Sequence, residues 1–196
     1  MNRNVAEIGK WPIVDTCSVW NLLSSPVFLR ACVSHSFEFA ITEFVLYECL
    51  HKPRKFPSDT DLELMQRFRQ ARTRDQFRTV SLTVDDLQDV SRLRMRRRVS
   101  KGELSSIAFA RRATMSFQTD DQGARKLAIE ELAFGSVQTT PHVLGWLFYH
   151  GKLADHELGR IIKEHEQVGR PLRKYFEQIY EEAMRCRLME RGRGPT

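Results

Sequence analysis

Five carboxylates stand where a parallel α/β fold can bring them together. Asp15 ends a short apolar run, and Glu48 lies within an apolar helical stretch. Glu103 opens another apolar helical stretch, and Asp120 and Asp121 follow a further short strand-like segment. Crowded carboxylates repel one another, and a nearby cation lets them stay charged. Because an all-oxygen ligand set suits Mg²⁺ or Mn²⁺ and zinc normally takes His or Cys, the sequence predicts a site for a hard divalent cation.

Each of these acids also has a purely structural interpretation. Glu103 can complete a capping box with the serine three residues before it. Asp120 or Asp121 can cap the following helix, although only one of the two can do so. Asp15 can be an ordinary helix-start residue, and an exposed helix face would accommodate Glu48. These alternatives stay open at the level of the sequence.

The elements that must position the acids alternate along the chain. Five short segments predict strands, at residues 13–17, 37–42, 77–82, 115–119 and 136–139; the first is an apolar run, and the third alternates between apolar and polar residues. Amphipathic stretches between them predict helices, of which Leu104–Ala113 has little polar surface. This alternation predicts a three-layer α/β/α fold with a central parallel sheet of about four or five strands. In such a sheet, strand ends and the starts of the following helices share one edge.

The C-terminal part of the chain is predicted to be helical from Leu153 onward. Apolar residues recur there at spacings of three and four, at Leu172, Tyr175, Phe176, Ile179, Tyr180 and Ala183. Such a stripe needs a cover, and we expect it to pack on the sheet domain, with a homodimer as the alternative. The predicted organisation is a sheet domain at 1–150, packed helices at 151–190 and a disordered tail at 191–196.

Composition narrows the class of protein. With 196 residues, 41% of them hydrophobic, the chain can fill one core. A net charge of +6, from 31 basic and 25 acidic residues, favours polyanionic partners. The four cysteines form no C-x-x-C pair, which predicts free thiols in a reducing cytosol and argues against a zinc or disulfide framework. Met1–Lys10 has no apolar signal core, and no apolar run approaches the ~18 residues of a membrane span, so we expect a cytoplasmic protein without a membrane partner.

Four segments resemble, in order, the motifs of PIN-domain proteins. Residues 13–23, IVDTCSVWNLL, resemble the opening strand that delivers the first metal-binding aspartate in that family. Residues 42–50, TEFVLYECL, are similar to the second motif, with its functional glutamate at Glu48. Residues 102–110, GELSSIAFA, resemble the Gly-Glu variant of the third motif, and 117–128, FQTDDQGARKLA, resemble the fourth.

The resemblance covers roughly Pro12 to Leu147 and has two departures. Cys17 stands where an asparagine is common in the family, which puts little in doubt. An insert around Lys52 to Arg74 and the helical C-terminus exceed a minimal PIN domain. These additions bear on which partner and which substrate the chain would take.

The resemblance implies a divalent-metal-dependent nuclease that acts on RNA. Many PIN-domain proteins are VapC-like toxins that an antitoxin holds inactive, so the implied partners are RNA and a cognate antitoxin. Asp15, Glu103 and Asp121 would hold Mg²⁺ or Mn²⁺, with Asp120 as a competing fourth acid. Glu48 would orient the attacking water from an outer shell.

Candidate substrate-binding groups lie beside the acids. Ser18 and Thr119 carry small hydroxyls that can bond water or phosphate, or serve as caps and turn residues. A basic run before Glu103 can grip a phosphate backbone or an acidic inhibitor, or it is a solvated helix end. This run comprises Arg92, Arg94, Arg96, Arg97, Arg98 and Lys101. No RNA-recognition motif with base-stacking aromatics is present, so the sequence does not indicate which RNA is recognised.

Two other functions compete with an endoribonuclease. A catalytically silent PIN-like module would bind RNA or protein without cleaving it. An aspartate-nucleophile phosphatase also places an acid after its first strand, but it usually needs a second aspartate two residues later. Cys17 occupies that position here. The sequence therefore favours a metal-dependent RNA hydrolase.

Overall fold

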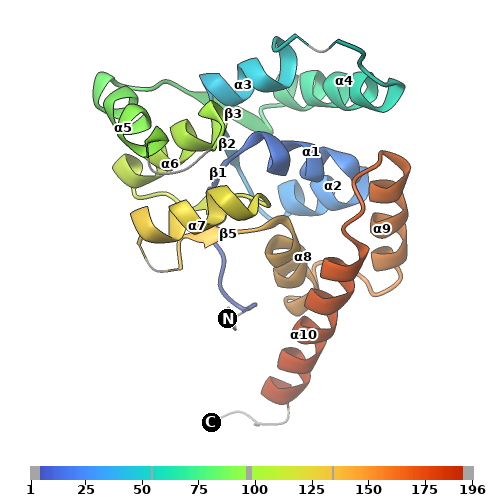
Figure 1. Ribbon diagram of the computed structural model, residues 1–196. Coiled ribbons are helices and arrows are strands. Elements are labelled where there is room, and N and C mark those ends of the chain that lie inside the picture. The colour runs from blue at the N-terminus through green and yellow to red at the C-terminus, as the bar shows by residue number, and fades with distance from the viewer. Residues whose placement is uncertain (1–4, 54, 96–98, 134, 192–196) are drawn as a thin grey trace.

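The computed structural model describes residues 5–53, 55–95, 99–133 and 135–191. Within these ranges the chain forms one five-stranded, all-parallel sheet with the strand order β3-β2-β1-β4-β5 (Figure 1). The strands are β1 (Ile13–Val14), β2 (Phe39–Thr42), β3 (Phe77–Val80), β4 (Phe117–Gln118) and β5 (Val137–Gln138). The predicted three-layer α/β/α fold with a parallel sheet of four or five strands is confirmed.

Helices connect successive strands and continue beyond the last one. Before β4 they are α1 (Thr16–Ser24), α2 (Pro26–Ser34), α3 (Glu43–Leu50), α4 (Asp59–Thr73), α5 (Val84–Arg94) and α6 (Lys101–Ala113). After β4 they are α7 (Gln122–Glu131), α8 (Thr140–Tyr149), α9 (Glu157–Gln167) and α10 (Arg173–Arg191). The helices α5, α6 and α7 lie on one side of the sheet, and α1, α2, α8, α9 and α10 lie on the other (Figure 1).

Alternating side chains along the strands build a separate core on each face of the sheet. Val14 and Ile41 join the core beneath α1, α2, α4 and α8, whereas Ile13 and Ala40 join the core beneath α5, α6 and α7. This division follows from the two-residue period of a strand. Both cores are needed to hold a parallel sheet, whose two faces must be covered.

The strands are shorter than the segments that predicted them. The run 13–17 contributes only Ile13 and Val14 to β1, because the Asp15 side chain caps α1 and the helix begins at Thr16. Likewise, α6 begins at Lys101 and not at Leu104, because Ser100 and Glu103 form a complete capping box. The sequence therefore placed these elements correctly but misjudged where α1 and α6 begin.

The C-terminal helices pack on the sheet domain. Phe176 and Ala183 of α10 are fully buried, and both belong to the same core as Phe148 of α8. The chain turns between α9 and α10, where Gly169 adopts a φ of +68° that a side chain would strain. Tyr175, predicted as part of the apolar stripe, is instead 57% exposed.

The structure also addresses the predictions about membrane spans and cysteines. No helix in the described ranges is both long and apolar enough to span a bilayer. All four cysteines are free, and Cys32 and Cys49 are buried. Residues 192–196, most of the tail predicted to be disordered, lie outside the described residues.

Candidate functional site

Four helices begin where strands of the sheet end. Asp15, Thr42, Asp121 and Thr139 cap α1, α3, α7 and α8, and each side chain accepts a hydrogen bond from a backbone N–H of the first turn. Helix N-termini carry a partial positive charge and free N–H groups. The carboxyl edge of the sheet therefore favours anions, both carboxylates and phosphates.

Asp15 is the most deeply buried acid at this edge. Its side chain has no exposed surface, and its Oδ1 accepts a hydrogen bond from the Ser18 amide at 2.7 Å. The Thr119 hydroxyl donates to its Oδ2 at 2.5 Å. Burial nevertheless raises the pKa of Asp15 to about 7, against the lowering effect of these bonds and with a further contribution from the charge of Asp120. Asp15 is thus a helix cap and also a carboxylate whose charge lacks compensation.

The two predicted hydroxyl ligands have structural contacts. Thr119 is fully buried and links two of the acids, because it donates to Asp15 and accepts a hydrogen bond from the Asp121 amide at 3.2 Å. Ser18 is also fully buried, and its hydroxyl donates to the Gln118 carbonyl at 3.1 Å. The geometry thus matches the capping and turn alternative for both residues.

Glu48 reaches the same edge from helix α3. The Thr16 hydroxyl donates to its Oε2 at 2.5 Å, and the Gly102 amide donates to its Oε1 at 3.1 Å. A Cβ atom at Gly102 would lie 2.5 Å from that Oε2, so the carboxylate occupies space that only glycine leaves open. Glu48 is half-buried between α1 and α6 and does not lie on a free helix face.

Glu103 forms the capping box that the sequence left as an alternative. Its carboxylate accepts a hydrogen bond from the Ser100 amide at 2.7 Å, and its own amide donates to the Ser100 hydroxyl at 3.3 Å. Burial raises the pKa of Glu103, and the charges of Asp121 and Glu48 raise it further. The cap therefore holds Glu103 beside two other acids.

The two neighbouring aspartates have different roles. Asp121 caps α7 and accepts a hydrogen bond from the Ala124 amide at 2.7 Å. Asp120 accepts three hydrogen bonds: from the Asn21 side chain at 2.7 Å, the Thr140 amide at 2.9 Å and the Thr140 hydroxyl at 2.5 Å. Loss of solvent around the carboxyl raises the pKa of Asp120. Asp121 is the helix cap, so capping does not explain why an acid stands at position 120.

A row of buried side chains leads from the N-terminal segment to Asp120. The Gln138 side chain accepts a hydrogen bond from the Gly9 amide at 3.1 Å and donates to the Gln118 side-chain oxygen at 3.5 Å. Gln118 in turn donates to the Thr140 hydroxyl at 3.4 Å, and this hydroxyl donates to Asp120. The row fixes the last residues of β4 and β5 against the site.

Sequence reasoning missed the partners that hold the acids. Glu48 is bonded by Thr16 and Gly102, which belong to α1 and α6. Asp120 is bonded by Asn21 and Thr140, which belong to α1 and α8. Asn21 carried a usable signal, because a polar residue inside the apolar α1 must find a buried partner. The other three look like ordinary first-turn residues.

The acids share an edge without forming one compact group. Among the described residues, no three Asp, Glu, His or Cys side chains are arranged so that they could hold a metal ion as they stand. Glu103 nevertheless senses the charges of Asp121 and Glu48, and Asp15 senses that of Asp120. The donor chemistry fits Mg²⁺ or Mn²⁺, because every acid offers oxygen and the buried Asp15 lacks a compensating cation. The shared metal site stays a prediction.

The predicted basic run is only partly described. Arg96, Arg97 and Arg98 lie outside the described residues. Lys101 is exposed in the first turn of α6. Arg92 pairs with Glu131 of α7 at 2.8 Å and with Asp89 at 3.3 Å, on the side of the sheet covered by α5 and α7.

Cys17 faces the acids but is not a reactive thiol. Burial raises its pKa to about 12, and the charges of Asp15 and Asp120 contribute to the rise. Its sulfur accepts a long hydrogen bond from the Asn21 side chain at 3.8 Å. The raised pKa therefore favours the protonated thiol over the nucleophilic thiolate at neutral pH.

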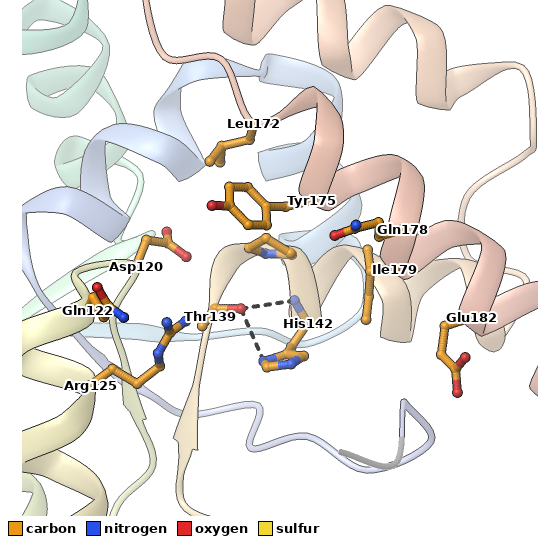
Figure 2. Close-up of a pocket in the computed structure, with 11 residues that line it drawn as sticks. Asp120, Gln122, Arg125, Thr139, His142, Leu172, Tyr175, Gln178, Ile179 and Glu182 are labelled. Carbon is orange, nitrogen blue, oxygen red and sulfur yellow. Dashed lines mark hydrogen bonds between the residues drawn. The ribbon is translucent and has the colours of Figure 1, made fainter. Parts of the chain in front are cut away.

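Two grooves border the acidic edge on the side of the C-terminal helices. The larger, about 620 Å³, runs between α7, the start of α8 and α10, and includes Arg125 and Tyr175 (Figure 2). The smaller, about 510 Å³, lies between α1, the start of α4 and the α9–α10 turn, and includes Arg170. Both grooves are lined by Asp120 and Leu172, so they meet at this acid.

The chain was compared with models of protein families and with curated proteins. No protein-family model matches the chain, and a search of curated proteins found no significant match. The likeness to PIN domains therefore rests on the four sequence motifs. The parallel sheet and the acids at its carboxyl edge are observed in the structure of this chain.

Proposed function

We propose that this chain is a divalent-metal-dependent endoribonuclease of the PIN type, which hydrolyses RNA phosphodiester bonds. The observation that carries the proposal is the gathering of five acids at the carboxyl edge of a parallel sheet. One of them, Asp15, is fully buried and has its pKa raised to about 7. Such a carboxylate costs stability unless a cation accompanies it, which supports a functional role for its burial.

The proposed roles are those that the PIN resemblance implies for the acids at this edge. Asp15, Glu103 and Asp121 would hold Mg²⁺ or Mn²⁺, with Asp120 as the competing acid. A bound cation of this kind lowers the pKa of water and neutralises charge on a phosphate. Glu48 would accept a hydrogen bond from the attacking water and orient it towards phosphorus. The helix N-termini at this edge would favour the approach of the phosphate.

The biological setting of the proposal rests on the family resemblance alone. A VapC-like toxin acts in the cytoplasm and is held inactive by an antitoxin, so the proposed partners are RNA and a cognate antitoxin protein. A homodimer is a further proposed state. The net charge of +6 supports a polyanionic partner and does not distinguish RNA from an acidic inhibitor.

A catalytically silent PIN-like module is the second candidate. It is favoured by one observation, namely that protein donors already bond each of the five carboxylates. Such a module would bind RNA or protein through the same edge and grooves.

Metal binding and cleavage by the full chain distinguish these candidates. We expect titration calorimetry to detect Mn²⁺ binding, and labelled RNA to be cleaved in Mn²⁺ but not in EDTA. Asp15→Asn should abolish both, because it removes a charged ligand while preserving the helix cap. Asp75→Asn is the matched control, since Asp75 is exposed and its φ of +55° suits asparagine.

The opposite results have defined meanings. Wild-type protein that neither binds Mn²⁺ nor cleaves RNA would be the silent module. Cleavage that survives Asp15→Asn undiminished would show that Asp15 has no part in the reaction.

A further inference from the structure

The two grooves beside Asp120 form a surface to which the PIN resemblance gives no role. One wall of each groove comes from the C-terminal segment Gly169–Glu182, which lies outside the resemblance. In Figure 2, Asp120 and Arg125 approach from the α7 side of the larger groove, and Tyr175 and Gln178 approach from α10. We propose that this C-terminal segment completes a binding groove for single-stranded RNA, with Tyr175 stacking on a base and Arg125 and Arg170 contacting phosphates on either side of Asp120. This inference rests on the proposed nuclease function.

Tyr175 presents an unused aromatic face. It stands in the first turn of α10, whose apolar neighbour Phe176 is fully buried, yet Tyr175 itself is 57% exposed. Figure 2 shows its ring inside the groove with the hydroxyl directed towards Asp120. In the described part of the chain its ring packs on no other aromatic ring. An exposed aromatic ring beside a proposed cleavage site is a platform on which a base can stack.

The two arginines flank Asp120 from separate elements. Arg125 of α7 lines the larger groove, and Arg170 of the α9–α10 turn lines the smaller. Neither forms an ion pair with any described residue, unlike Arg92 of α5 and Arg112 of α6 on the other side of the sheet. Unpaired guanidinium groups on both sides of the acid would contact successive phosphates of a strand that crosses it.

The remaining polar groups suit a strand with unpaired bases. Gln122 and Gln178 project amide groups from the two walls of the larger groove. Amides can donate to and accept from base edges, which only unpaired bases expose fully. Stacking on Tyr175 also requires a base with a free face, so a duplex would not use this groove.

Binding measured in EDTA tests the groove separately from catalysis. The probe is a short, fluorescein-labelled single-stranded RNA of mixed sequence, and its affinity for the full chain is measured by fluorescence anisotropy. Tyr175→Ala should weaken binding roughly five- to 100-fold, and Tyr175→Phe should stay within about twofold of wild type, because the phenyl ring still stacks. Arg125→Gln and Arg170→Gln should each lower the salt dependence of log Kd by about one unit.

Matched controls come from exposed residues away from the groove. Tyr47→Ala removes a tyrosine on α3 that is 51% exposed, and Arg30→Gln removes an exposed arginine on α2. Both variants should bind RNA like wild type, and thermal melts should show that every variant is folded. In Mn²⁺, Tyr175→Ala should raise KM for RNA cleavage more than it lowers kcat.

The results separate this inference from the proposed function. Binding that is unchanged by Tyr175→Ala, equally weakened by Tyr47→Ala, or tighter for the annealed duplex would overturn the groove. If cleavage still depends on Asp15 in that case, the nuclease stands without it. RNA binding that depends on Tyr175 in a protein that cleaves nothing would support the groove and refute the nuclease.

Discussion

Replacing Gly102 with alanine should separate activity from stability. The added Cβ would lie 2.5 Å from Oε2 and 2.9 Å from Cδ of Glu48. Ordinary contacts begin near 3.4 Å, so the carboxylate must move by about 1 Å. The move also breaks the bond from the Gly102 amide to Glu48 Oε1. Glu48 would then no longer lie where the proposed reaction needs it.

The size of each effect can be worked out from these contacts. Displacing a positioning group by about 1 Å costs on the order of a hundredfold in rate. Alanine in a helix is favoured over glycine by roughly 0.5–1 kcal/mol, and loss of the hydrogen bond costs about 1 kcal/mol. These two terms nearly cancel, so the free energy of unfolding should change by no more than about 1 kcal/mol. We therefore expect RNA cleavage to fall about a hundredfold in a protein that unfolds in nearly the same urea concentration.

A double variant shows whether Glu48 transmits the effect. In a Glu48→Ala background, Gly102→Ala should cause no further loss of cleavage, because the displaced group is already absent. Gly159→Ala is the matched control, since a Cβ there meets nothing within 4 Å, and it should leave cleavage unchanged. Full activity in Gly102→Ala, or an equal loss with and without Glu48, would refute this reasoning.

Three further perturbations test other parts of the structure. Burial lowers the pKa of His165 from 6.5 to about 4, so wild type should lose up to about 3 kcal/mol of stability as pH falls from 6.5 to 4. His165→Leu should lack this loss in urea unfolding across that pH range. For Asp15 the sign is reversed: its raised pKa makes metal-free protein less stable as pH rises from 4 to 7. Asp15→Asn should therefore be more stable than wild type by up to about 4 kcal/mol at pH 8 in EDTA. Gly145→Ala would place a Cβ 2.5 Å from Cγ1 of Ile179, so melts should show a loss of about 1–3 kcal/mol, and adding Ile179→Ala should cost less than the sum of the two changes.

The sequence predicted the elements of the fold because short segments typical of strands alternate with longer helical patterns. It could not place every boundary, because Asp15 and Ser100 start helices earlier than the apolar pattern indicates. The break between α9 and α10 was missed, although Gly169 and Pro171 mark it. A local sequence pattern shows which residues are apolar, but it does not show which polar residue will cap a helix.

The acids could be predicted, but their partners could not. Asp15 and Glu48 were recognisable from motif and position, whereas Thr16 and Thr140 bond carboxylates that are distant in the sequence. Tyr175 was assigned to a buried stripe because its spacing fits one. It is exposed because α10 packs Phe176 against Phe28 of α2 and His165 of α9, which leaves the preceding residue facing the groove.

The side chains of Gln138, Gln118 and Thr140 form a row of hydrogen bonds in which each group donates to the next, and the row ends at Asp120. The Gln118 side-chain amide donates a hydrogen bond to the Thr140 hydroxyl. This hydroxyl therefore directs its only hydrogen towards Asp120. Both groups that bond Oδ2 of Asp120, the Thr140 hydroxyl and the Asn21 amide, present a donor to it, so a proton on this oxygen would meet no acceptor as they stand. A chain of hydrogen bonds that begins at the Gly9 amide thus favours the charged form of Asp120, against the burial that raises its pKa.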